Sequence, residues 1–140
     1  GHIAERNEAR NYDVLKQKQE AGADFFISQL FCENRHFLGF RDRARAVGVN
    51  KPLVAGIMPV LSKSQIKNMI FMCGTALPGA VVKMLHRYGD DGDSLRAAGM
   101  DYAFCQAEEL IKEGVDGVHL YTMNQPIIAE KGMERLRGRP

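Results

Sequence analysis

The segment Glu113–Val118, EGVDGV, decides the fold, because the same pattern recurs near the start of the chain as Ala21–Phe26, AGADFF. In both, a helical pattern stops at a glycine suited to the left-handed position after a helix, and an apolar strand starts two or three residues later. A third version runs from Ala46 to Pro52, just before the apolar stretch Leu53–Met58. The sequence therefore predicts helices alternating with parallel strands, an α/β fold.

The spacing of these junctions sets the number of strands that we expect. Strands start near residues 24, 53 and 117, and a further strand has room near residue 80. This spacing predicts about four βα units of roughly 30 residues each. Their apolar strands favour a parallel sheet covered by helices. Four units fit either a small open sheet or half of an eightfold barrel, because a complete barrel typically needs about 250 residues. The sequence pattern does not distinguish between these two architectures.

Apolar residues at helical spacing predict the helices between the strands. One expected apolar face consists of Phe37, Phe40, Ala44 and Val47, and another of Ile66, Met69, Ile70 and Cys73. Ser62–Gln65 matches a capping box at the start of the second of these helices. A long helix is expected from Asp93 or Ser94 to Lys112, with Leu95, Tyr102, Gln106 and Leu110 roughly in line. Pro78–Tyr88 fits either a short strand or a helix opened by its proline.

Composition favours one folded domain and argues against nucleic-acid and membrane partners. A chain of 140 residues that is 45% apolar can bury a core. Its 19 Lys and Arg against 17 Asp and Glu give a formal charge of +2. This excess of positive charge is too small to neutralise many phosphates of a nucleic acid. The sequence contains neither an apolar run of membrane-spanning length nor the apolar core of a signal peptide. The cysteines are odd in number and widely spaced, so we interpret them as reduced thiols of a cytoplasmic protein: Cys32, Cys73 and Cys105.

The common phosphate and metal motifs are missing from the sequence. No GxGxxG follows a strand and no GxxxxGK[ST] occurs. The Asp90–Asp93 cluster lacks the ligand frame of a calcium loop, so we interpret it as a turn that caps the next helix. The four histidines also lack metal-ligand spacing: His2, His36, His86 and His119. We expect no metal site.

Amide side chains mark the ends of the predicted strands. Gln29 ends one strand, Gln65 follows Pro59 in a first helical turn, and Tyr121–Gln125 follows the last strand. Ligands of parallel α/β folds gather at the carboxyl ends of strands, so we expect these residues at one rim. A glutamine amide both donates and accepts hydrogen bonds, which suits a flat heterocycle. Alternatively, Gln29 is a satisfied core amide and Gln65 acts only in the capping box.

Four motifs, in order and at similar spacing, resemble methylenetetrahydrofolate reductase over nearly the whole chain, from His2 to about Arg135. They are ADFFISQLF, FLGFRDRA (Phe37–Ala44), VAGIMPV and GVHLYTMN. The resemblance implies the second half of a flavin-dependent (βα)8 TIM barrel, as a single partial domain over residues 1–140. It further implies that NADH or NADPH reduces 5,10-methylenetetrahydrofolate through FAD to 5-methyltetrahydrofolate, in the one-carbon metabolism that serves methionine biosynthesis.

The resemblance also implies binding roles by position. Its implied FAD contacts are His2, Glu5, Asn11, Val14, Gln17 and Lys18. Its implied substrate contacts are Gln29, Gln65, Met69, Tyr121, Met123 and Gln125. Three of these depart from the family: Asn11 replaces an Asp, Met69 a stacking Phe, and Gln125 an Arg. Exchanging a cation for an amide at position 125 should weaken binding of a substrate carboxylate.

The family's proton-donating Glu and its Asp beside the flavin would both precede residue 1, so the resemblance implies no catalytic residue in this chain. The chain would then supply binding walls, as a C-terminal part of the enzyme or as a silent partner of an N-terminal half or of itself. Exposed barrel edges would drive such pairing. An aldolase-like lyase is a further alternative, for which Lys83 is the single, weak Schiff-base candidate.

Overall fold

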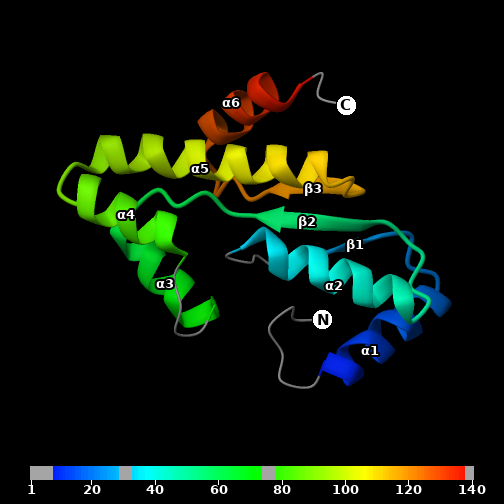
Figure 1. Ribbon diagram of the computed structural model, residues 1–140. Helices are drawn as coiled ribbons and strands as arrows, with labels where there is room; N and C mark the ends of the chain where they lie inside the picture. Colours follow the sequence, from blue (N-terminus) through cyan, green and yellow to red (C-terminus); the bar gives the residue numbers. More distant parts are fainter. Residues whose placement is uncertain (1–7, 29–32, 74–77, 138–140) are drawn as a thin grey trace.

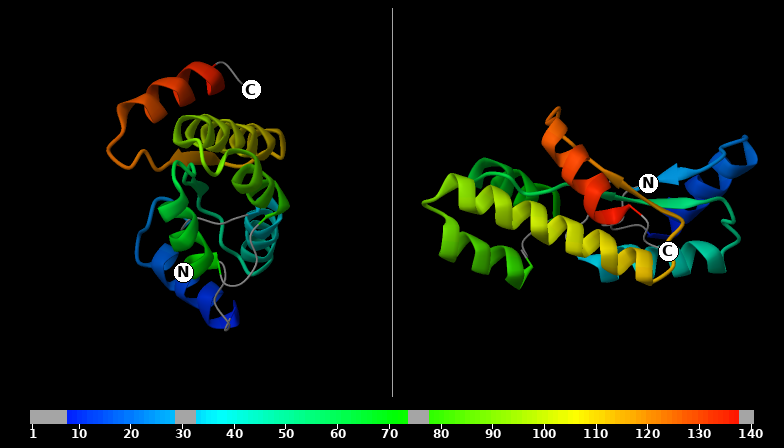
Figure 2. Two further views of the ribbon diagram at one scale, coloured as in Figure 1. Left: turned by 90° about the vertical axis from the view of Figure 1, so that its left-hand side faces the viewer. Right: turned by 90° about the horizontal axis from the view of Figure 1, so that it is seen from above.

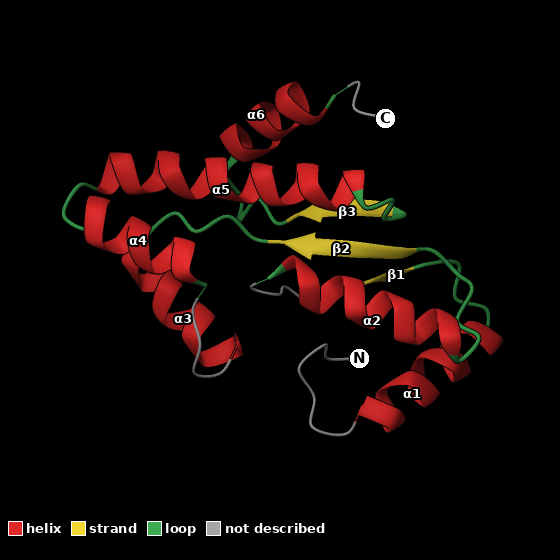
Figure 3. Ribbon diagram, viewed as in Figure 1, coloured by secondary structure: helices red, strands yellow, loops and turns green. Residues whose placement is uncertain are grey.

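The computed structural model describes residues 8–28, 33–73 and 78–137 (Figure 1). Helices and strands alternate along most of this range, and Figure 3 shows several helices beside one small sheet. The elements are α1 (Glu8–Glu20), β1 (Phe26–Ile27), α2 (Asn34–Ala46), β2 (Leu53–Ile57), α3 (Lys63–Cys73), α4 (Gly79–Tyr88), α5 (Gly92–Lys112), β3 (Gly117–Leu120) and α6 (Pro126–Leu136).

The three strands form one parallel sheet in the order β1-β2-β3. Phe26 lies opposite Leu53, and Val54 lies opposite Gly117, so the carboxyl ends of the strands meet at the same edge. The predicted α/β class with parallel strands is confirmed.

Of the two structures that the sequence left open near residue 80, the helix is confirmed as α4 and the further strand is not formed. Val81, Met84 and Leu85 pack into one small cluster with Val60, whereas Val82 is exposed. Burial at i, i+3 and i+4 is the one-sided pattern of a helix, and a strand would bury alternate residues. The helix begins directly after Pro78, whose fixed φ suits a helix start. The described residues therefore contain three strands instead of the predicted four.

The three predicted junctions are confirmed in detail. Gly22, Gly48 and Gly114 have φ values of +106°, +95° and +75°, a region that favours glycine. The residue after each glycine donates its N–H to a carbonyl five residues earlier, as Val49 does to Ala44 at 3.0 Å. These bonds form Schellman motifs, which end a helix and turn the chain into the next strand.

The core lies on one side of the sheet, between the strands and helices α2 and α5. Figure 2 shows both helices on the same side of the strands when the molecule is viewed from above. From α2, the predicted residues Phe37, Phe40 and Ala44 are buried; Val47 is 42% exposed because it lies beyond the last helical turn. The buried cluster comprises Tyr12, Leu15, Phe37, Phe40, Ala44, Val49, Leu53, Ala55, Ile57, Ala103, Ala107 and Leu110.

The opposite face of the sheet carries no helix among the described residues. Phe25 and Ile27 are 56% and 46% exposed, and His119 is exposed as well. Parallel sheets are normally covered on both faces, so this face is unusual for an isolated sheet.

Helix α5 covers the sheet with its second half and extends beyond the carboxyl ends of the strands with its first half (Figure 1). Its start confirms the predicted cap, since Asp91 accepts a hydrogen bond from the Ser94 N–H at 3.2 Å. Gly99 lets the helix approach the chain that follows β2, because a Cβ there would lie 1.6 Å from the Val60 carbonyl oxygen.

Candidate functional site

The side chain of Tyr121 joins the carboxyl ends of all three strands. Tyr121 follows β3, and its hydroxyl donates to the carbonyl oxygen of Ser28, directly after β1, at 3.3 Å. Between them the ring passes Gly56 of β2, where a Cβ would lie 3.0 Å from the Tyr121 Cε2 atom. The Ser28 hydroxyl in turn accepts the Gly56 N–H at 2.9 Å. Sequence reasoning missed Ser28 and Gly56, although a glycine inside a strand commonly marks such a close approach.

The uncovered face of the sheet also carries His119, two residues before Tyr121. The two rings meet edge to face, with centroids 4.7 Å apart and an interplanar angle of 80°. Side chains two residues apart on a strand point to the same face, so the sequence held a signal for this pair. An exposed imidazole and a phenol ring thus share the face that no helix covers.

A tight turn follows Tyr121. The Gln125 N–H donates to the Thr122 carbonyl at 2.9 Å, and the two central residues, Met123 and Asn124, have φ values of +51° and +58°. Left-handed φ is costly for a side chain such as methionine, and strain of this kind clusters at ligand sites. The turn holds Met123 at the rim with 53% of its surface exposed.

Gln125 lies at the end of this turn and occupies the N-cap position of α6, where its side chain forms no capping hydrogen bond. Its Oε1 accepts a hydrogen bond from Nη2 of Arg96, in the second turn of α5. Both side chains are half-buried. The structure therefore brings a guanidinium, which sequence reasoning missed, to the predicted rim position 125.

Gln65 takes the structural role that the capping box predicted. Its N–H donates to the Ser62 hydroxyl at 3.4 Å, while its Oε1 accepts from the Leu61 N–H at 2.5 Å, one residue before the position usual in a capping box. Its Nε2 has no hydrogen-bond partner within the described part of the chain. Met69 lies one turn further along α3, and its side chain lies outside the description.

The predicted flavin contacts are only partly described. Asn11 is 5% exposed, Val14 is half-buried, and Gln17 and Lys18 are exposed on α1. The spacing of Asn11, Val14 and Lys18 places them along one side of that helix. The predicted site residues His2, Glu5 and Gln29 lie outside the described residues.

The α1 residues do not join the cluster around Tyr121. Gln19, next to Lys18, bonds the chain before β2, where its Oε1 accepts the Asn50 N–H at 2.8 Å. Lys18 consequently lies toward the amino-terminal edge of the sheet. Asn11, nearly two turns earlier on a helix that runs opposite to the strands, lies closer to the carboxyl edge (Figure 1).

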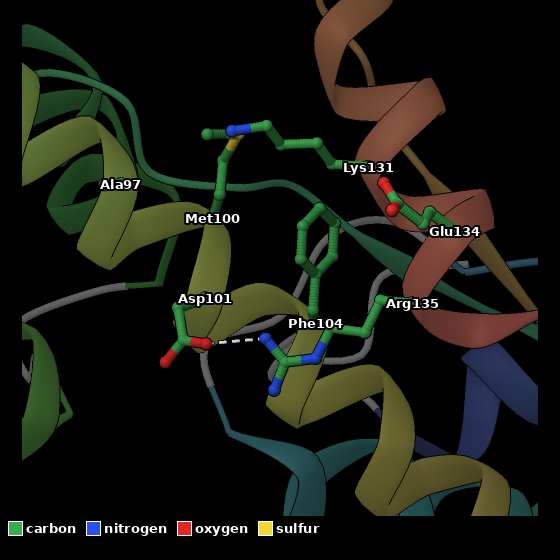
Figure 4. Close-up of a pocket in the computed structure, with 7 residues that line it drawn as sticks. All are labelled: Ala97, Met100, Asp101, Phe104, Lys131, Glu134 and Arg135. Atoms are coloured by element: carbon green, nitrogen blue, oxygen red, sulfur yellow. Dashed lines mark hydrogen bonds and ion pairs between the residues drawn. The ribbon is translucent and has the colours of Figure 1, made fainter.

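A groove between α5 and α6 has the character of helix packing (Figure 4). Arg135 of α6 forms ion pairs with Asp101 and Glu108 of α5, each at 2.5 Å, and its guanidinium lies 5.9 Å from the Phe104 ring centroid. These carboxylates raise the pKa of Arg135 further above its ordinary value. Since protein carboxylates hold the Arg135 guanidinium, this cation serves to pack α6 on α5.

Asp116 lies at the amino-terminal edge of β3, away from the rim. Its Oδ2 accepts from Arg45 Nη2 at 2.6 Å and from the Leu53 N–H at 2.9 Å. This carboxylate therefore links the starts of β2 and β3.

Within residues 8–28, 33–73 and 78–137, no three His, Cys, Asp or Glu side chains gather as a metal-ion site would require. Over the same ranges, no helix combines the length and the apolar character needed to cross a bilayer.

Comparison with known proteins gives consistent matches. The family model described as methylenetetrahydrofolate reductase matches residues 1–136. Methylenetetrahydrofolate reductase (NADH) 1 of Arabidopsis thaliana is 34% identical over 79% of this chain and 19% of its own length. The 5,10-methylenetetrahydrofolate reductase of Escherichia coli is 32% identical over 79% of this chain and 38% of its own. The chain thus spans well under half the length of these relatives.

Proposed function

Because the chain belongs to the methylenetetrahydrofolate reductase family, we propose that it supplies binding walls for the FAD-dependent reduction of 5,10-methylenetetrahydrofolate to 5-methyltetrahydrofolate by NADH or NADPH. The observation that carries this proposal is the Tyr121 ring, which lies over Gly56 on the uncovered face of the sheet. Aromatic rings stack on flat heterocycles, and both a pterin and a flavin are of that kind.

The architecture that we propose is the C-terminal half of a (βα)8 barrel, as a single partial domain over residues 1–140. The uncovered sheet face supports it, because closing the sheet into a barrel would bury Ile27 and the other side chains that this face leaves exposed. In a barrel the substrate site lies at the carboxyl ends of the strands, where Tyr121 and the turn after it stand.

The residues of α1 fit a flavin dinucleotide. Lys18 offers an exposed cation, which suits a phosphate group. Gln17 adds an amide donor and Val14 an apolar contact from the same helix. When bound, FAD supplies the hydride transfer between the nicotinamide nucleotide and the folate. His2, Glu5 and Asn11 complete the proposed FAD contacts.

The substrate contacts that we propose lie along the rim. Gln65 presents its Nε2 as a hydrogen-bond donor, because its Oε1 is already occupied by the Leu61 N–H. Met123 offers an exposed, polarizable thioether that can pack on a ring edge. Gln29 and Met69 remain proposed contacts. We assign the proton donor to the other part of the barrel.

Flavin and folate binding test this function in the barrel completed by an N-terminal half. We expect the protein to retain a perturbed flavin absorption spectrum after unbound FAD is removed. Tyr121→Leu should raise KM for 5,10-methylenetetrahydrofolate about tenfold, as expected for a lost aromatic stack of about 1.4 kcal/mol. Tyr88→Leu, in the last turn of α4 and away from the strand ends, is the matched control. An unchanged KM in Tyr121→Leu would contradict the proposed site.

A second candidate function is a catalytically silent chain that pairs with an N-terminal half or with itself. The open edge of β3 favours it, because an apolar groove of about 610 Å³ runs between that strand and α6, beside Val118, Leu120 and Met133. Met133 is 64% exposed there. Sedimentation of the 140-residue chain discriminates the two: a compact monomer that binds FAD would exclude the pairing partner, and a colourless dimer would favour it.

A further inference from the structure

Arg96 differs from Arg45 and Arg135, two other arginines that link separate elements. Arg45 is neutralised by Asp116, and Arg135 by Asp101 and Glu108. Arg96 forms no ion pair with any carboxylate of the described ranges, and its one hydrogen-bond partner there is the neutral Oε1 of Gln125. Among the described residues, its charge therefore has no counter-ion although the side chain is half-buried.

A guanidinium has five N–H donors in a rigid planar fork. Gln125 accepts from Nη2 and so occupies one part of that fork. The bond also fixes the orientation of the group, because Gln125 is itself held at the end of the 122–125 turn by its N–H bond to Thr122. The remaining donors suit the two oxygens of a carboxylate or phosphate, which arginine binds in bidentate fashion.

Arg96 lies near the carboxyl ends of the strands, the rim at which we propose the substrate site. Helix α5 begins at the carboxyl end of the sheet, and Arg96 lies in its second turn. Gln125 follows Tyr121 by four residues, so the guanidinium, the exposed Met123 and the Tyr121 ring border the same edge. Because no carboxylate of the described residues pairs with this cation, an anionic ligand at this edge would gain a charge-assisted contact.

We propose that Arg96, oriented by Gln125, binds an anionic oxygen group of a ligand at the rim. The inference rests on the proposed function, under which that group is a glutamyl carboxylate of the folate or a phosphate of the nicotinamide nucleotide. Arg96 is then a binding residue that sets affinity for the charged part of the ligand and leaves the reacting atoms untouched.

Titration calorimetry on the barrel completed by an N-terminal half tests this role. The probes are 5-methyltetrahydrofolate, its diamide with both glutamyl carboxylates converted to amides, and NADH. We expect Arg96→Gln to weaken 5-methyltetrahydrofolate binding about tenfold and to leave the diamide unaffected, since one charge-assisted contact is lost. Arg96→Lys should restore part of the affinity. Arg87→Gln, which removes an exposed cation on α4, is the matched control.

The outcomes separate the two possible anions and the two proposals. Weaker binding of NADH alone would identify a nucleotide phosphate as the anion. Equal weakening of the carboxylate and diamide forms, or a lower Tm with all affinities unchanged, would overturn the inference and leave a purely structural link between α5 and α6. A wild-type protein that binds both ligands without reducing the folate would contradict the proposed function while the Arg96 comparison still stands. A wild-type protein that binds neither would remove both proposals.

Discussion

The ring of Tyr121 lies against the α-carbon of Gly56, on the neighbouring strand of the sheet. A Cβ at position 56 would stand 2.5 Å from the Ser28 carbonyl oxygen as well as 3.0 Å from the Tyr121 ring. Because the first of these neighbours is backbone, it cannot move aside as a flexible side chain would. A glycine at this position therefore allows an aromatic ring to bridge three strands.

Gly56→Ala should destabilise the protein by about 1 to 3 kcal/mol, the usual cost of forcing an extra methyl group into a packed site. Urea denaturation measures the change in the free energy of unfolding. Gly117→Ala is the control within the same sheet, because its Cβ would meet Val54 at an ordinary 3.5 Å. Equal effects of the two substitutions would contradict the close approach at Gly56.

Tyr121→Phe keeps the ring over Gly56 and removes the hydrogen bond to the Ser28 carbonyl. The expected loss is about 0.5 to 1.5 kcal/mol of stability, the net contribution of a single hydrogen bond. The free energy of unfolding of Tyr121→Phe is compared with that of Tyr88→Phe, whose hydroxyl forms no side-chain bond in the described residues. A neutral Tyr121→Phe would show that the hydroxyl does not anchor the ring.

The left-handed turn at Met123 predicts a difference between two substitutions that remove the same side chain. Met123→Gly should be more stable than Met123→Ala by about 1 kcal/mol, because glycine adopts positive φ without strain. Thermal denaturation of the two variants measures this difference directly. If alanine proved as stable as glycine, the backbone at position 123 would not be strained.

Asp91 makes the start of α5 sensitive to acid. Hydrogen bonds from the Ser94 hydroxyl and N–H lower its pKa below the ordinary value of 3.8. Because the folded-state pKa is depressed, the stabilisation is complete above pH 3.8 and is lost as the pH falls below it. Asp91→Asn should therefore be less stable than wild type near neutral pH, and the difference should vanish in strong acid.

Denaturation of both proteins across this pH range provides the measurement. Asp90→Asn is the control, since Asp90 is fully exposed and its one ion pair among the described residues is with exposed Lys63 at 3.5 Å. A wild-type advantage that persisted in strong acid would mean that the cap does not depend on the carboxylate charge.

The helix–strand junctions were predictable from sequence because local backbone chemistry determines them. Gly22, Gly48 and Gly114 each end a helix in a conformation that other residues rarely adopt, so three positions sufficed to predict the alternation. Segment 78–88 was ambiguous for a physical reason. Its run of apolar residues fits a strand as well as a helix. The helix buries one apolar side against Val60 and Ile66, which are distant in sequence, and the local pattern does not contain that contact.

The site was only partly predictable. Tyr121 and Gln125 follow a strand, and their place at the rim follows from the parallel topology. Arg96 was not predictable, because it lies 29 residues before Gln125 on a helix with no unusual composition at that point. Ser28 was missed because its role lies partly in a backbone carbonyl, which every residue has.

Helix α5 has a length that the sheet does not match. Its 21 residues span about 31 Å, whereas the five residues of β2 span about 16 Å. Roughly half of the helix therefore extends beyond the strand ends, and Arg96 lies in that part. A regular helix, instead of a loop, thus positions the guanidinium that we propose as the anion-binding group.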